Sequence, residues 1–180
     1  DEEAEMTIDE VNDHWEAIGA VSEIDDKEDP PLEGQNATAY RSVTARLNYM
    51  APDRVDIQYT TKECARHMST PRESHLAGLI KIGKYLAGRP RLVNHYKWQA
   101  EMSMITGFTD SDWAGCQVTA KSTSGGIVAV GSHLIKTYCR QQKTVALSSA
   151  EAELHAMVAA SAEVMGIIGL FNDVGVQMEG

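Results

Sequence analysis

Two carboxylates, Asp110 and Glu153, have neighbours that suit a metal-dependent hydrolase. Asp110 closes the run "MSMITGFTD", which alternates as a strand does, and Asp112 follows two residues later. Glu153 lies in "SSAEAELHAMV", which is rich in helix-forming residues. Two acids held close together repel unless a proton or a cation lies between them, and Mg²⁺ prefers carboxylate oxygens. The same residues also fit a polar turn and a solvated helix start, so spacing alone leaves both interpretations open.

The elements that must position these acids are a small sheet and a helix. Alternation and apolar runs predict strands in "MSMITGFTD", "GGIVAVGS" and "HLIKTYCR", with a hairpin turn at Gly131 and Ser132 between the last two. "RLVNHYKW" also alternates and predicts a strand that ends at Trp98. The region 99–147 is therefore expected to be an antiparallel meander.

A long helix is predicted after the meander. Ser148 or Ser149 can cap its start, acids in its first turns suit the helix dipole, and Gly175 marks its end. Packing of this helix on the sheet would bring its first turns close to a strand end. We expect the helix to bury four apolar side chains against the sheet: Leu147, Leu154, Met157 and Val158.

Residues 38–88 predict three helices. In the first, an apolar face recurs at spacings of three and four: Tyr40, Val43, Leu47 and Met50. The third is expected to have Ser69 or Thr70 as its cap and Pro71 as its first residue, and to end at Gly88.

Charge divides the chain into three parts. The net charge is -10, but residues 1–40 hold fourteen acidic side chains and one base, a net of -13. Residues 41–98 carry eleven bases and four acids, a net of +7, and residues 99–180 carry four and eight, a net of -4. We expect an acidic flexible linker over 1–37, a helical basic connection over 38–98 and a folded domain over 99–180. The basic surface suits either solubility or contact with phosphate.

Composition excludes several classes of protein. A hydrophobic fraction of 43% and a charged fraction of 23% are ordinary for a globular chain. No uninterrupted apolar run reaches the roughly 18 residues of a membrane span, so no membrane partner is expected. The cysteines Cys64, Cys116 and Cys139 are widely spaced and form no CxxC pair, so we expect neither a disulfide partner nor a zinc site.

Three stretches together resemble one family. "AYRSVTARLNYMAPDRVDIQYTTKECARHMSTP" is similar to the connection after the reverse transcriptase in copia-type (pseudoviral) retrotransposon Pol polyproteins. "FTDSDWAGCQVTAKSTSGG" and "ALSSAEAELHA" resemble the opening half of the ribonuclease H domain of the same polyproteins. The order and spacing of the stretches match that family from about residue 38 to about residue 175.

The resemblance implies a fold, a chemistry and partners. The fold is ribonuclease H-like, of the α+β or α/β class, with a three-stranded antiparallel meander, a long helix and a preceding helical connection. The chemistry is two-metal hydrolysis of the RNA strand of an RNA–DNA hybrid, with Mg²⁺ (or Mn²⁺) held by the catalytic residues Asp110 and Glu153. The implied partners are the hybrid and the reverse transcriptase domain of the same polyprotein. The implied location is cytoplasmic, within particles, or nuclear.

Several other side chains are candidates for contact with nucleic acid. Trp113 suits packing or base stacking, and His155 suits a structural or a catalytic role. The candidates for phosphate contact are Arg41, Arg46, Lys81, Lys84, Arg89, Arg91, Lys121 and Ser122.

The sequence departs from the family pattern after the long helix. The family places further catalytic aspartates beyond that helix, Asp173 does not match them, and Gly180 comes before the stretch that would hold them. We therefore expect a C-terminally truncated half-site with little or no nuclease activity. The alternatives are a nucleic-acid-binding or connecting module with a degenerate ribonuclease H remnant, and a host protein that has reused the fold structurally.

Overall fold

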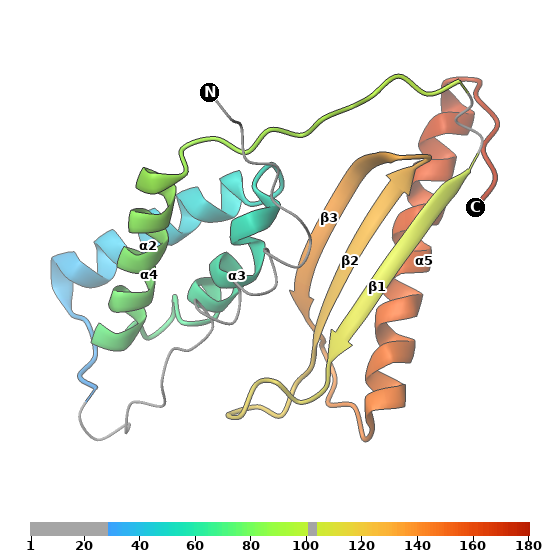
Figure 1. The fold of residues 1–180 in the computed structure, drawn as a ribbon. Helices are drawn as coiled ribbons and strands as arrows, with labels where there is room; N and C mark the ends of the chain where they lie inside the picture. Colours follow the sequence, from blue (N-terminus) through green and yellow to red (C-terminus); the bar gives the residue numbers. More distant parts are fainter. Residues whose placement is uncertain (1–28, 101–103) are drawn as a thin grey trace. The chain divides into compact units, whose positions relative to one another are not determined.

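The computed structural model describes residues 29–100 and 104–180 and divides the chain into two compact units, 1–92 and 93–180. The first unit contains helices and the second a three-stranded sheet with one long helix (Figure 1), so the chain has a mixed α+β fold. Most of the expected acidic linker, residues 1–28, lies outside the described residues.

The helical unit consists of α2 (Gly34–Met50), the 3₁₀ turn η1 (Val55–Ile57), α3 (Gln58–Arg66) and α4 (Glu73–Gly88). Its core contains Tyr40 and Leu47 of α2, and the Tyr40 hydroxyl donates a 2.8 Å hydrogen bond to the Cys64 carbonyl. The predicted stripe on α2 is only partly right, because Val43 and Met50 are largely exposed. The other buried members of the core are Ile57, Cys64, Leu79 and Ile82.

The start of α4 differs from the prediction. Arg72 is the N-cap and Glu73 the first helical residue, so neither Ser69 nor Thr70 caps this helix. Asp29 supplies a carboxylate instead, which accepts hydrogen bonds from the Ser74 amide and hydroxyl at 2.9 and 2.5 Å. Burial by itself would raise the pKa of Asp29, but these bonds, with His75 and Arg72 nearby, hold the pKa below its usual value.

The docked Asp29 also changes where the linker ends. A bridge pairs Pro31 with Arg72, and α2 already begins at Gly34. Residues 29–37 therefore belong to the helical unit and not to the acidic linker that the charge pattern predicted over 1–37.

Residues 91–98 do not form the predicted strand. Side chains tie this segment to the β2–β3 hairpin instead: the Tyr96 hydroxyl donates to the Leu134 carbonyl, and a His133 ring nitrogen lies 2.6 Å from the Lys97 carbonyl. The alternation of apolar residues predicted a strand wrongly, because this segment does not pair with any of the three described strands of the sheet.

The sheet is an antiparallel meander of β1 (Ile105–Asp112), β2 (Thr123–Val130) and β3 (His133–Gln141), in the order β1-β2-β3. The predicted hairpin is confirmed: β2 and β3 are joined at Gly131 and Ser132, and Gly131 has a φ of +58° that glycine adopts without strain. Ile105, Val128 and Val130 form the buried core beneath the helix.

Helix α5 (Ser149–Asp173) lies along one face of this sheet (Figure 1), and its predicted ends are confirmed. The Ser148 hydroxyl accepts from the Glu151 amide at 3.2 Å. At the other end Gly175 has a φ of +82°, and the Val176 amide donates to the Phe171 carbonyl at 2.9 Å, as in a Schellman motif.

The buried face of α5 was predicted wrongly. Ala152, Ala156 and Ala160 are buried, whereas four larger side chains are exposed: Leu147, Leu154, Met157 and Val158. The approach is close, since a Cβ added to Gly107 of β1 would lie 3.0 Å from Val164. The first turns of α5 therefore pack on the sheet through alanines, and larger side chains such as Val164 and Ile167 pack against the core further along the helix.

Within the described part of the chain, α5 alone is long and apolar enough to cross a membrane by length and composition. Its Glu163 forms ion pairs with Lys136 and Arg140 of β3, at 2.5 and 2.6 Å. Packing on the sheet accounts for the apolar inner face of the helix.

Candidate functional site

Asp110 lies near the end of β1, opposite Gly125 of β2. The strand continues to Asp112, which is its last residue. Because β1 is an edge strand, its free edge leaves room for side chains from both faces of the sheet.

The two carboxylates approach this edge from different sides. Successive side chains of β1 point to opposite faces of the sheet. Gly107 and Ser111 lie on the face toward α5, because Gly107 adjoins Val164 and the Ser111 hydroxyl contacts Gln142, which also binds α5. Asp110 therefore belongs to the opposite face and is exposed, whereas Glu153 on α5 is half-buried.

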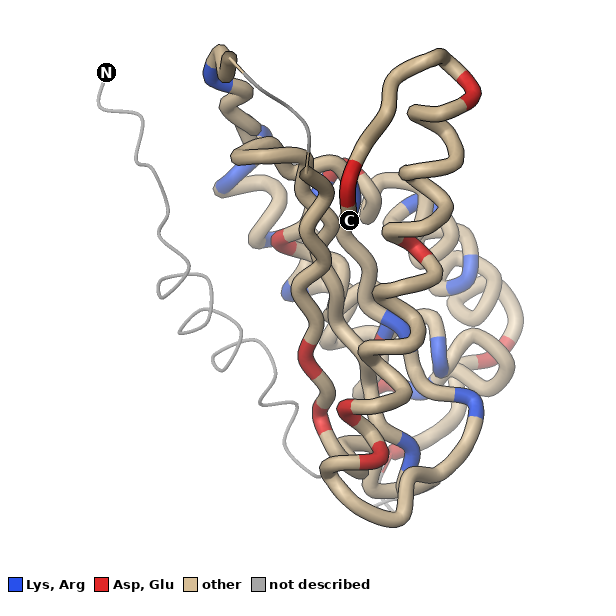
Figure 2. Tube along the Cα trace, turned by 90° about the vertical axis from the view of Figure 1, so that its right-hand side faces the viewer, with Lys and Arg blue, Asp and Glu red and all other residues tan. Residues whose placement is uncertain are grey.

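The backbones that carry the two acids are held together at one end of the unit. The Gln142 side-chain nitrogen lies 3.4 Å from the Ser111 hydroxyl, next to Asp110, and 2.9 Å from the carbonyl of Ala152, next to Glu153. Figure 2 shows acidic positions at the end of β1 beside those at the start of α5, where Figure 1 also shows the two elements meeting. The structure thus brings the predicted pair to one end of one unit.

Both carboxylates are available to an external ligand. The side-chain carboxylates of Asp110 and Glu153 form no hydrogen bond or ion pair with any residue in the described ranges. Glu151 differs, because its carboxylate accepts from the Leu147 amide at 2.7 Å and so helps to cap the helix. Glu151 is therefore a capping residue and not one of the candidate metal ligands.

The donor set fits a weakly held cation and not a two-metal centre. Residues 29–100 and 104–180 contain no group of three or more His, Cys, Asp or Glu side chains that could hold a metal ion. Mg²⁺ can be held by one or two carboxylates together with water and substrate phosphate, whereas two adjacent ions need more negative charge than two carboxylates supply.

Trp113 and His155 both have structural contacts at this end of the unit. The Trp113 indole nitrogen donates to the Ala146 carbonyl at 3.1 Å, and Nδ1 of His155 lies 3.3 Å from the Gln142 side-chain oxygen. These contacts favour packing for Trp113 and a structural role for His155 over the catalytic alternative.

The candidate phosphate contacts differ in their exposure to solvent. Ser122 is fully buried and its hydroxyl accepts from the Ala114 amide, so it cannot touch nucleic acid as predicted. Arg41 donates to the Met68 and Ser69 carbonyls at 2.8 and 3.2 Å and so helps to close the helical unit. Lys121 is half-buried, and the remaining candidates are exposed: Arg46, Lys81, Lys84, Arg89 and Arg91.

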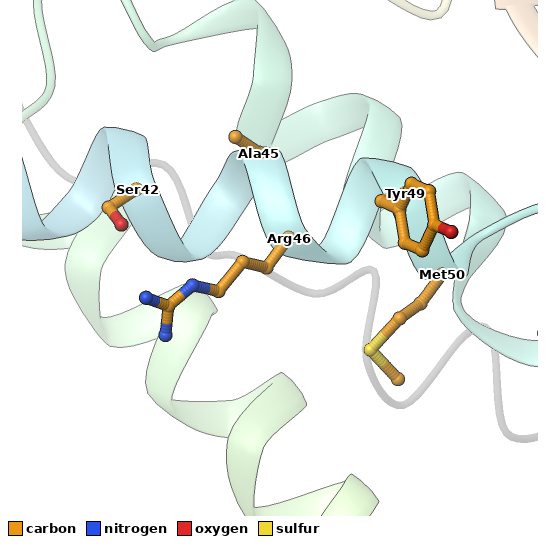
Figure 3. Close-up of a pocket in the computed structure, with 5 residues that line it drawn as sticks. All are labelled: Ser42, Ala45, Arg46, Tyr49 and Met50. Atoms are coloured by element: carbon orange, nitrogen blue, oxygen red, sulfur yellow. The ribbon is translucent and has the colours of Figure 1, made fainter.

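The structure has two surface pockets near the candidate residues. One, of about 510 Å³, lies along α2, where Arg46 and the highly exposed Tyr49 line it with Ser42, Ala45 and Met50 (Figure 3). The other, of about 610 Å³, lies between β1 and α5 and is mostly apolar. Neither Asp110 nor Glu153 lines it, so it is not the candidate metal site.

Gln142 is the residue of this end of the unit that sequence reasoning missed. It lies just beyond β3 in a run of polar residues, "CRQQKT", and nothing in that run distinguishes a buried glutamine from its exposed neighbours. Only the folded chain shows that Gln142 is buried while Lys143 is exposed.

A three-stranded meander packed on one helix, together with a separate helical unit, defines a mixed α+β fold. Comparison narrows the class. The "Retrovirus-related Pol polyprotein from transposon RE1" of Arabidopsis thaliana is 35% identical over 143 residues, which are 78% of this chain and 10% of that protein. The corresponding polyprotein from transposon RE2 is 33% identical over 141 residues, again 78% of this chain and 10% of that protein.

The chain therefore belongs to the family of copia-type, retrovirus-related Pol polyproteins, and it spans about a tenth of the length of these two relatives. An uncharacterized mitochondrial protein of Arabidopsis thaliana is also similar, at 31% identity over 69% of this chain and 52% of that protein. No family model and no solved structure matches the chain.

Proposed function

We propose that residues 93–180 are part of a ribonuclease H-like domain of a retrotransposon polyprotein, acting on the RNA strand of RNA–DNA hybrids. The observation that carries this proposal is the pair Asp110 and Glu153: both are unengaged within the described structure, and one buried side chain binds the residues next to them. The order of strands and helix, β1-β2-β3 then α5, supports it.

Asp110 and Glu153 would hold Mg²⁺ or Mn²⁺ at the free edge of β1. The bound ion supplies activation of water and stabilisation of the leaving oxygen in phosphodiester cleavage. Ser148 and Glu151 cap α5 and so fix the turn that presents Glu153. With two described carboxylates the ion is held weakly, so we expect little cleavage from this chain.

Metal binding can be tested directly by titrating the ¹⁵N-labelled chain with Mn²⁺ and recording which amide signals broaden. We expect broadening near both Asp110 and Glu153, reduced by Asp110→Asn or Glu153→Gln. Asp173→Asn is a matched control, because this exposed acid lies at the far end of α5. Broadening that survives Asp110→Asn and Glu153→Gln unchanged would contradict the proposal.

Cleavage is a separate measurement. A labelled RNA–DNA hybrid incubated with the chain and Mg²⁺ should be cut slowly or not at all. Robust cutting that Asp110→Asn abolishes would show that another group completes the site, and the half-site interpretation would then be wrong.

A binding role for the helical unit is the second candidate, and the hollow on α2 favours it. Exposed Tyr49 beside Arg46 offers a ring for base stacking and a cation for phosphate. The proposed partners are the hybrid and the reverse transcriptase domain of the same polyprotein, in cytoplasmic particles or in the nucleus.

Salt dependence separates the two candidates. Each phosphate contact contributes roughly 0.7 to 0.9 to the slope of log affinity against log salt concentration. Neutralising Arg46, Lys81, Lys84 and Arg91 together should therefore lower the slope by roughly 3. If hybrid binding keeps its slope in this variant but depends on Mg²⁺ and Glu153, the helical unit is not the binding surface.

A further inference from the structure

Gln142 is buried at 9% exposure and makes side-chain contacts with three different parts of the second unit. Its side-chain nitrogen reaches the Ser124 hydroxyl of β2 and the Ala152 carbonyl of α5, both at 2.9 Å, and the Ser111 hydroxyl of β1 at 3.4 Å. Its side-chain oxygen lies 3.3 Å from Nδ1 of His155. One side chain thus joins β1, β2 and the first turns of α5.

The backbone of Gln142 is fixed as well. Its amide donates to the Ser122 carbonyl at 2.8 Å, just before β2 begins. The Ser122 hydroxyl in turn accepts from the Ala114 amide at 3.0 Å, just after β1 ends. Gln142 is therefore held on both sides of its Cα by the segments that flank the candidate site.

We propose that Gln142 is a positioning residue for the cation site, setting the depth and rotation of the first turns of α5 against the end of β1. This inference rests on the proposed function of Asp110 and Glu153. The contacts to Ala152 and His155 bracket Glu153 in sequence, so they restrain the helical turn that carries its carboxylate. The contact to Ser111 restrains the strand residue next to Asp110.

The amide is better suited to this role than an apolar side chain. The first turns of α5 pack on the sheet through the small residues Ala152 and Ala156, whereas larger side chains such as Val164 pack further along the helix, so the first turns have few apolar side chains to fix their position. Directed hydrogen bonds at 2.9 Å from a buried amide fix one arrangement, because a shift would leave buried polar groups without partners.

Gln142→Met tests the inference, because methionine keeps the length and volume of the side chain but removes its hydrogen bonds. The full 180-residue chain is titrated with Mn²⁺, and the broadening near Asp110 and near Glu153 is measured separately. Residues that orient metal ligands typically change metal affinity about 10-fold or more when they are replaced. We expect a loss of about that size, with broadening near Glu153 falling more than broadening near Asp110.

A control and a second variant separate positioning from simple loss of stability. Val130→Ala removes buried methyl groups at the opposite end of the same sheet and should leave Mn²⁺ affinity unchanged while lowering stability. Ser124→Ala removes one partner of Gln142 and should reduce Mn²⁺ affinity by less than Gln142→Met does. It keeps the test decisive if Gln142→Met fails to fold.

Each outcome has one meaning. Equal broadening at both acids in Gln142→Met and in the unaltered chain would overturn the positioning role, as would a loss of affinity of the same size in Val130→Ala. If Gln142→Met does not fold, an unchanged affinity in Ser124→Ala overturns it. Broadening that is insensitive to Asp110→Asn would instead overturn the proposed cation site itself, so the two failures are distinguishable.

Discussion

The helical unit should lose stability in mild acid because of one partly buried histidine. The rings of His67 and His75 are stacked with centroids 3.7 Å apart and planes 19° apart. Burial, together with the electrostatic effects of His75 and Arg66, lowers the pKa of His67 to about 4, against the opposing effect of Glu63 and Asp29. The folded unit therefore holds His67 neutral at pH values where the unfolded chain protonates it.

The sign and size follow from linkage. The pKa of His67 is lower in the folded state than the unfolded value of 6.5, so its contribution is fully present above pH 6.5 and is lost as the pH falls toward 4. The difference between 6.5 and about 4 corresponds to about 3 kcal/mol for a fully buried group. Because the ring is only partly buried, solvent screening reduces this, and we expect about 1.5 to 2 kcal/mol.

His67→Phe is the informative change, since phenylalanine keeps a ring against His75 but cannot take a proton. Urea unfolding should be followed through NMR signals of the helical unit at pH 7.5 and at pH 4.5. The unaltered chain should lose about 1.5 to 2 kcal/mol more between these pH values than His67→Phe does. His95→Gln, which removes an exposed histidine, should change nothing. An equal loss in the unaltered chain and in His67→Phe would refute the reasoning.

Three further changes test the packing of the two units. Asp56→Ala leaves the buried guanidinium of Arg54 without its bidentate partner, at 2.7 and 2.9 Å, and should cost about 3–5 kcal/mol in urea unfolding. Gly126→Ala places a Cβ 2.2 Å from the ring of Tyr138. It should lower the free energy of unfolding by about 1–3 kcal/mol, which is measured as a lower thermal midpoint. Glu163→Gln should cost about 1 kcal/mol at pH 7 and nothing near pH 2. The reason is that hydrogen bonds from lysine and arginine lower the pKa of Glu163, so its contribution disappears as the carboxylate protonates; thermal unfolding at both pH values checks it.

Local sequence patterns were sufficient to predict where α5 begins and ends and where the β2–β3 turn lies. Ser148 before an acid-rich turn, Gly175 after the helix and the Gly131–Ser132 turn each act through a few neighbouring backbone groups, so a local pattern carries the information. The start of α4 was missed for the opposite reason. Its amide partner is Asp29, some 45 positions away in sequence, and no local pattern reports such a cap.

Long-range packing was the part that sequence patterns could not supply. Leu154 and Val158 suit a buried helix face by hydropathy, but the face of α5 that meets the sheet carries Ala152, Ala156 and Ala160, followed by larger side chains such as Val164. Asp110 and Glu153 were identified through a family resemblance, and the fold brings the segments that carry them together. The tie between those segments, Gln142, has no sequence signal, because whether a polar residue after a strand is buried depends on residues as distant as Ser111.

The buried amide of Gln142 supports the proposed cation site over the proposal of simple nucleic-acid binding for the second unit. Burying a polar side chain costs free energy unless its hydrogen bonds are satisfied, and an apolar residue would fill the same space without that cost. A module that only bound phosphate would need exposed cations, which lie mainly on the other unit, and would tolerate a helix that shifts slightly on its sheet. A site that shares a cation between strand and helix would not tolerate such a shift, since carboxylate oxygens must meet the ion within narrow limits of distance. The hydrogen bonds of Gln142 join the end of the sheet near Asp110 to the turn of α5 that carries Glu153. A shared cation requires such a fixed arrangement.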